Sequence, residues 1–237
     1  MQTVVRVCLI VLLAAAVAGC AAPTPATQAL LQLAWPGAGE AAVVQARAAR
    51  LNPAFTHLYL RQPGQDPAFL VLGYIEPGEP PTLVWFSADR EVVRTRGGHL
   101  AGVTGLPEGK AGMRYYPGLP AWPALVDPAH DGAALAFARV WDVPGQYRFG
   151  LRDTVTLGPV SPQRLPAAIT RHLRHALGQT AYPQWRWFEA TSTLLPTAWY
   201  AVAPVRGQPQ VVYSFQCLSA ERCVHLAPWP VGGVALP

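Results

Sequence analysis

The chain has 237 residues, of which 51% are hydrophobic and 13% are charged, and its formal net charge is +5. With 25 prolines and 21 glycines it has the composition of a turn-rich globular protein, which excludes an intrinsically disordered chain. The cations stand singly or alternate, as at Arg94 and Arg96, and form no dense basic block. We therefore expect no nucleic-acid partner.

The first twenty residues, MQTVVRVCLIVLLAAAVAGC, predict a secretory signal peptide that ends in a lipobox. The apolar run over residues 7–18 is too short to span a bilayer comfortably and suits a cleaved leader. It closes on the order Val-Ala-Gly-Cys, which is typical of bacterial lipoproteins, where the cysteine thiol receives a diacylglycerol. Residues 1–19 are therefore predicted to be the signal peptide, and Cys20 the lipid attachment site. In the alternative interpretation, Cys20 is a small residue of an ordinary leader.

The residues after the lipobox predict where the anchored chain lies. Ala21 stands where an aspartate would signal retention at the inner membrane, so we expect the outer membrane, with the protein facing the periplasm. Outer-membrane lipid is then the first expected partner, because several acyl chains hold a protein more firmly than one. Residues 20–29 predict a lipidated tether, and residues 30–237 a single mainly β periplasmic domain.

The first half of this domain predicts a short helix followed by strands. The alanine-rich residues 40–50 predict the helix, although the VVQ within them would suit a strand equally well. Runs of apolar and β-branched residues then alternate with Pro-Gly turns, which predicts strands over residues 55–62, 68–76 and 82–88. A further strand follows, bounded by a turn at residues 89–90 and a bend at Gly97-Gly98.

The second half predicts a long loop over residues 107–132, a hairpin over 133–160 and a helix over 161–180. The hairpin turns at Pro144-Gly145. Along its second strand, alternation predicts a core face and a wet face that carries the arginines and threonines. The residues predicted for the core face are Tyr147, Phe149, Leu151, Val155 and Leu157.

Four more short strands follow the helix, in WRWFEATSTLL, AWYAVAPV, PQVVYSFQCL and CVHLAPW. About ten strands against one or two short helices predict a mainly β fold. The strands are expected to form a coiled sheet, a sandwich or an open barrel of antiparallel strands.

Two cysteines remain in the predicted mature domain, Cys217 and Cys223, on either side of LSAER. An even pair in an oxidising compartment predicts a disulfide that closes a hairpin loop, worth about 2 kcal/mol for so short a loop. The alternative is a metal site, which would need more ligands than the nearby His225.

Three side chains are candidates for chemistry. His172 and His175 stand three apart on the predicted helix, close enough for one metal ion, but a site needs a further ligand; the alternative is a basic, solvated helix face. Glu189 lies in a strand beside aromatic residues and could serve in the acid–base pair of a glycan hydrolase or lyase. The alternative is a structural role. The sequence has no G-x-S-x-G, H-E-x-x-H, P-loop or C-x-x-C motif. We expect no metal and no cofactor.

Trp185 and Trp187 are a candidate glycan contact, because aromatic rings pack on the apolar faces of sugars. In a strand the two indoles point the same way, and Arg186 and Phe188 the other. The alternative is that the tryptophan face belongs to the core.

Three segments between residues 51 and 106 carry a resemblance to a known family: LNPAFTHLYLR, FLVLGYIE and WFSADREVVRTRGGHLAGVTGL. They resemble the YjbF/GfcB family of bacterial lipoproteins, which is associated with exopolysaccharide and group 4 capsule production. The lipobox and the late strand before SFQCL fit the same plan. The chain departs from the family at His99, where many relatives have arginine.

The resemblance implies a periplasmic protein of coiled, bifurcated β-sheets that is tethered to the outer membrane and is not an enzyme. We expect an accessory lipoprotein for production, secretion or assembly of an extracellular or capsular polysaccharide, with the polysaccharide or export-machinery proteins as partners. One alternative is a periplasmic glycan-modifying enzyme with an unrecognised carboxylate pair. Another is a structural envelope lipoprotein that does not contact glycan.

Overall fold

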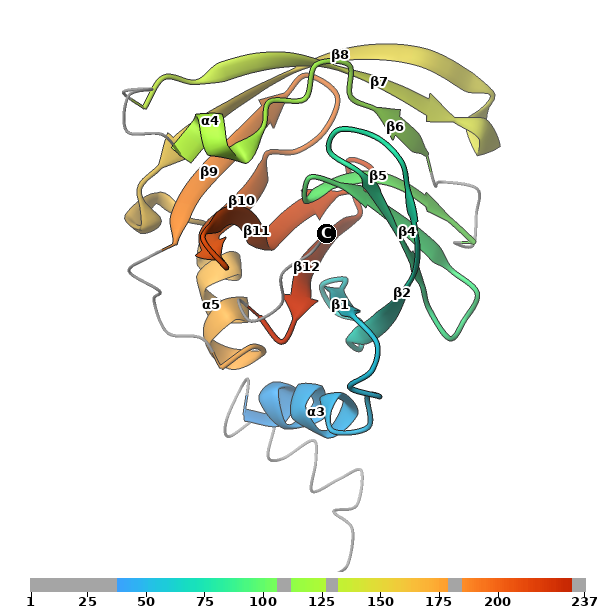
Figure 1. Cartoon of the computed structure of the whole chain (residues 1–237), viewed down its shortest axis with the longest axis vertical. Coiled ribbons are helices and arrows are strands. Elements are labelled where there is room, and N and C mark those ends of the chain that lie inside the picture. The colour runs from blue at the N-terminus through green and yellow to red at the C-terminus, as the bar shows by residue number, and fades with distance from the viewer. Residues whose placement is uncertain (1–37, 106–111, 127–131, 179–184, 232–237) are drawn as a thin grey trace, which may run out of the picture.

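The computed structural model describes residues 38–105, 112–126, 132–178 and 185–231 (Figure 1). The predicted signal peptide, Cys20 and the tether lie outside these residues. Within them, twelve antiparallel strands form one closed barrel in which each strand pairs with its neighbours along the chain, and β1 pairs with β12 to close the sheet. The predicted mainly β class is confirmed, and of the expected arrangements the barrel is realised, in closed form.

The strands follow the predicted turn rhythm closely. They are β1 His57–Arg61, β2 Ala68–Glu76, β3 Thr82–Phe86, β4 Val92–Arg96, β5 His99–Thr104, β6 Met113–Tyr115, β7 Leu135–Val143, β8 Arg148–Val160, β9 Arg186–Ser192, β10 Ala198–Val205, β11 Gln208–Cys217 and β12 Cys223–Trp229. Among the described residues, the α-helices are α3 Ala38–Ala48, α4 Trp122–Val126 and α5 Ala167–His175, and 3-10 turns span Pro144–Gln146 and Pro162–Arg164. α4 and β6 lie within the segment that was predicted to be a long loop.

The barrel wall has an apolar covering outside and a mixed core inside. On the outside, Val44 of α3 and Ile169 of α5 pack with Tyr59, Tyr213 and other strand residues in one buried cluster. The strand residues that alternate with these, such as Leu58, Phe188 and Leu226, belong to two further clusters. Since alternate residues of a strand face opposite sides, these two clusters fill the interior, and α3 and α5 cover part of the outer wall.

The β7–β8 hairpin reaches beyond the barrel wall. Val155 and Leu157 are buried as predicted, but Tyr147 is 89% exposed and Phe149 is 61% exposed, so their prediction as core residues is wrong. The reason is the register: β8 pairs with β9 only from Val155 onward. The residues before it have β7 as their one strand neighbour in the described part of the chain, and the tip projects into solvent.

The Cys217–Cys223 disulfide is present and joins the directly paired ends of β11 and β12. It closes the predicted short loop and fixes the connection between these two strands. The predicted bend at Gly97-Gly98 is also confirmed, since both residues adopt positive φ angles, of 54° and 78°.

Gly98 has a second reason to be glycine, because a Cβ at this position would overlap the side chain of Val211 on β11. Gly207 has a matching φ of 80° and open space around it. We predict that Gly207→Ala lowers the free energy of unfolding by about 1 kcal/mol through backbone strain alone. Gly98→Ala should lower it by about 1–3 kcal/mol more, because the added Cβ overpacks the contact with Val211. Urea unfolding of both variants measures the difference, and equal losses would contradict the close approach of β5 to β11.

Candidate functional site

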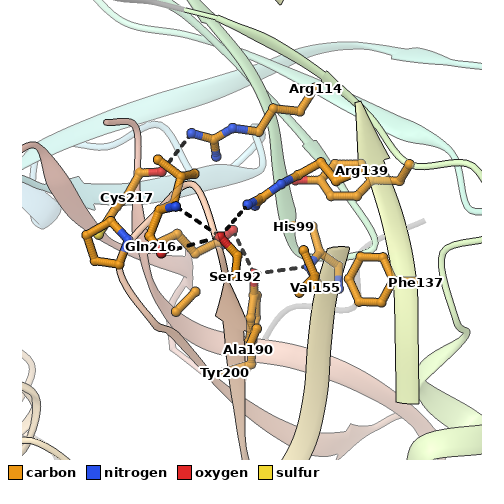
Figure 2. A pocket seen from close by; sticks show the side chains of 14 residues that line it. His99, Arg114, Phe137, Arg139, Val155, Ala190, Ser192, Tyr200, Gln216 and Cys217 are labelled. Atoms are coloured by element: carbon orange, nitrogen blue, oxygen red, sulfur yellow. Dashed lines mark hydrogen bonds between the residues drawn. The ribbon is translucent and has the colours of Figure 1, made fainter. Parts of the chain in front are cut away.

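The barrel interior contains a connected group of polar side chains centred on Gln216 (Figure 2). Gln216 Oε1 accepts hydrogen bonds from the Leu100 amide at 2.8 Å and from the Tyr200 hydroxyl at 3.0 Å. Its Nε2 donates to the Gly98 carbonyl and to Ser214 Oγ, both at 2.8 Å. Because β11 and β5 are not neighbours in the sheet, Gln216 ties opposite walls of the barrel together.

His99 completes this network from β5. Its Nδ1 lies 3.0 Å from the Tyr200 hydroxyl. Since Tyr200 donates its single proton to Gln216, Nδ1 of His99 is the donor to Tyr200. Burial, aided by the charge of Arg139, lowers the pKa of His99 to about 3. His99 is therefore neutral and structural, packed against the parallel ring of Trp122 at 5.4 Å.

An ion pair holds the neighbouring part of the wall. Arg139 on β7 donates to Oδ2 of Asp153 on β8 through both Nε and Nη2. Its Nη2 also donates to Ser192 Oγ on β9 at 3.1 Å. Asp153 Oδ1 accepts from the amide and hydroxyl of Thr193 at 3.2 and 3.1 Å. Burial alone would raise the pKa of Asp153, but the hydrogen bonds and charge of Arg139 outweigh it, and the net pKa is lowered.

Arg114 connects β6 to the disulfide end of β11. Its Nη2 donates to the carbonyl oxygens of Cys217 at 2.7 Å and Leu218 at 3.0 Å, and its guanidinium lies 5.2 Å from the ring centroid of Trp141. Like Gln216, it therefore links strands that are not neighbours. The free space among all these side chains is about 10 Å³. That is room for about one water molecule, so this site braces the fold and does not hold an organic ligand.

Larger spaces lie at the two ends of the barrel. Because chain-neighbouring strands alternate in direction, alternate connections lie at the same end. A groove of about 510 Å³, lined by residues that include Pro80, Trp122 and Pro209, lies at the end with the β2–β3, β4–β5 and β10–β11 connections. At the other end, a pocket of about 250 Å³ lies under the β7–β8 hairpin, and residues 219–221 of the β11–β12 connection form its opposite wall.

The predicted glycan contact at Trp185 and Trp187 is corrected by the structure. Both indoles are only 6% exposed and belong to the cluster that contains Ile169 and Leu173 of α5. The alternation of the strand was predicted correctly, but the helix covers the tryptophan face. The alternative interpretation, in which the two rings form part of the core, therefore holds.

A second buried polar group lies between α5 and the outer wall. His172 stacks on His225 of β12 with ring centroids 3.6 Å apart, and the Tyr213 hydroxyl lies 2.6 Å from Nδ1 of His225. Burial, aided by the charge of Arg61, lowers the pKa of His172 to about 3. Burial also lowers the pKa of His225 to about 2, aided by His172 and Arg61.

These positions also correct the interpretation of His172 and His175 as one solvated helix face, because His172 is buried. No group of three or more metal-binding side chains occurs among the residues that the structure describes. Glu189 is half-buried on β9, directly opposite Trp199 of β10. In the same described ranges, no helix has the length and apolar character needed to cross a bilayer.

The fold defines a class of proteins: antiparallel β-barrels closed in chain order, with a filled interior. The chain is similar in fold to the crystal structure of a hypothetical lipoprotein, YmcC, from Escherichia coli K12. The TM-score is 0.50 at 20% sequence identity, and the match covers 91% of this chain and 100% of that one. No family model and no curated protein matches the sequence.

The ion pair inside the barrel gives a sharp stability prediction. Asp153→Asn leaves the buried Arg139 without its carboxylate and should cost about 3–5 kcal/mol of unfolding free energy. Asp66→Asn is the matched control: it removes the partner of Arg47 from a pair that is largely exposed, and should cost at most about 1 kcal/mol. Denaturant unfolding measures both, and a small loss for Asp153→Asn would show that the interior pair does not brace the wall.

Three buried histidines whose pKa values are strongly lowered, His99, His172 and His225, predict a loss of stability in mild acid. In the unfolded chain each binds a proton near pH 6.5, whereas the folded protein keeps His99, His172 and His225 neutral down to about pH 3 or 2. Stability is therefore complete above pH 6.5 and falls below it, by up to about 4 kcal/mol per pH unit for the three together. Unfolding measured from pH 7 to 4 tests this, and His225→Phe should reduce the slope by about one third. A flat profile between pH 6 and 4.5 would contradict the assignment.

Proposed function

We propose that this protein is a lipoprotein of the outer membrane, facing the periplasm, that assists the production, secretion or assembly of an extracellular polysaccharide without catalysing a reaction. The observation that carries the proposal is the lipobox ending at Cys20, together with the resemblance of residues 51–106 to the YjbF/GfcB lipoproteins. The likeness in fold to a protein described as a hypothetical lipoprotein supports the first part.

The geometry favours action by contact. Many interior polar groups are engaged with one another: Gln216 uses both ends of its amide and Asp153 both carboxylate oxygens, while His99 Nε2 and Arg114 Nε have no partner. Little space is left between them. A glycan chain or an export protein would therefore meet this protein at its outer surface or at the ends of the barrel, where the larger pockets lie.

Gene deletion with complementation tests the proposal. The deletion strain should secrete less polysaccharide, or polysaccharide of altered length, and the wild-type gene should restore it. The variant Cys20→Ser should leave the membrane fraction and restore secretion poorly. Unchanged secretion in the deletion strain would overturn the role, and membrane retention of Cys20→Ser would overturn the lipid anchor.

An assay with purified protein separates contact from catalysis. Purified protein incubated with the native polysaccharide should leave its chain length and composition unchanged. Shortening or chemical alteration of the glycan, abolished by replacing a pair of carboxylates, would instead establish the glycan-modifying enzyme.

A further inference from the structure

We infer that the pocket under the β7–β8 hairpin, here called the hairpin pocket, binds one acidic sugar unit of a glycan chain. This inference rests on the proposed function and names the ligand class that the protein would contact. The polar and aromatic residues that line the hairpin pocket are Trp141, Gln146, Arg148, Ser219 and Glu221.

The size and position of the hairpin pocket suit a unit of a longer chain. Its volume of about 250 Å³ lies below the roughly 300–1,000 Å³ of pockets for drug-sized ligands, and so suits a single ring. The hairpin crosses the end of the molecule opposite α3, where the described chain begins (Figure 1). The hairpin pocket therefore lies at the end of the barrel opposite α3.

Unsatisfied polar groups point to a ligand that carries hydrogen-bonding oxygens. Trp141 is 8% exposed, and its indole Nε1 has no hydrogen-bond partner; the same holds for the buried hydroxyl of Ser219. Nε1 of Trp141 lies against Gly112, which does not line the pocket, and Arg114 covers the ring, so Ser219 is the one of the two that a ligand can meet there. A buried hydroxyl that lacks a partner is costly, and a sugar hydroxyl or a carboxylate in the pocket would supply one.

Arg148 favours an acidic sugar over a neutral one. Its exposed guanidinium has no ion-pair partner among the described residues, and it can hold a carboxylate through two parallel hydrogen bonds. Of the nearby carboxylates, Asp142 already accepts a hydrogen bond from the Gly150 amide at 2.7 Å, which leaves Glu221 for sugar hydroxyls.

The hairpin tip adds aromatic surface beside the hairpin pocket. Tyr147 and Phe149 stand in solvent at the rim, and Tyr147 adopts the left-handed φ of 52° that non-glycine residues rarely take. Exposed apolar side chains that are grouped on a surface can mark an interaction site. They can pack on the apolar faces of the units that follow the bound one.

Calorimetric titration of the full lipoprotein in detergent micelles tests the inference with two probes, trigalacturonate and the neutral maltotriose. Trigalacturonate should bind, and maltotriose should bind at least about tenfold more weakly. Arg148→Gln should weaken trigalacturonate binding roughly 10- to 100-fold. Arg206→Gln is the matched control, because Arg206 is an exposed arginine on the β10–β11 connection at the other end of the barrel, and it should leave binding unchanged.

Ser219→Ala removes the unpartnered hydroxyl that lines the pocket and should weaken trigalacturonate binding several-fold. No binding of trigalacturonate, equal binding of maltotriose, or equal losses for Arg148→Gln and Arg206→Gln would each overturn the inference. Binding to phosphatidylglycerol vesicles that Arg148→Gln abolishes, without binding to trigalacturonate, would assign the hairpin to a membrane instead. A secretion defect in the deletion strain without glycan binding would refute the hairpin pocket and leave the proposed function standing. Glycan binding without a secretion defect would refute the proposed function and leave the hairpin pocket standing.

Discussion

The amide of Gln216 bridges two walls of the barrel that are not neighbours in the sheet, and much of the structure depends on that bridge. Its oxygen accepts a hydrogen bond from the Leu100 amide, and its nitrogen donates one to the Gly98 carbonyl. A side chain on β11 therefore satisfies backbone groups at the start of β5. The approach is close enough that position 98 must lack a Cβ. Arg114 makes a comparable link between β6 and the end of β11.

These bridges explain why a barrel of twelve strands has a filled interior. A barrel of eight strands is already just wide enough for side chains to fill, and the diameter grows with strand number. Here opposite walls approach each other, large rings such as Trp85 and Phe188 occupy the interior, and polar groups are paired inside it. Because the interior is filled, a partner can contact this protein only at the ends of the barrel or on its outer surface.

The sequence predicts the strands well because its turns are chemically explicit. Gly97-Gly98, Pro144-Gly145 and the Pro-Gly runs between the first strands place the connections, and alternation gives each strand two faces. What alternation does not give is which face is covered. Trp187 faces the underside of α5, which precedes it in the chain by more than ten residues. Tyr147 fits the apolar alternation of β8 but lies beyond the last residue that β9 covers.

The sequence does not predict the interior network, for a different reason. Gln216 and Leu100 are 116 residues apart, and Arg114 and Cys217 are 103 apart, so no local pattern announces either contact. One local signal did exist: Arg139 stands at an inward position between Phe137 and Trp141, as Asp153 does before Val155 and Leu157. A buried charged residue on an apolar strand face needs a partner of opposite charge. Arg139 and Asp153 lie on paired strands, directly opposite each other.

The central claim, that the Gln216 bridge holds the barrel closed across its interior, is tested most directly by hydrogen exchange at the Leu100 amide under native conditions. That amide donates to a side chain from the opposite wall. The account predicts that it exchanges only through global unfolding, with the same protection as the amides of the β10–β11 ladder. Fast exchange at Leu100 while β10 and β11 stay protected would contradict it, because the walls would then be separating without the barrel unfolding.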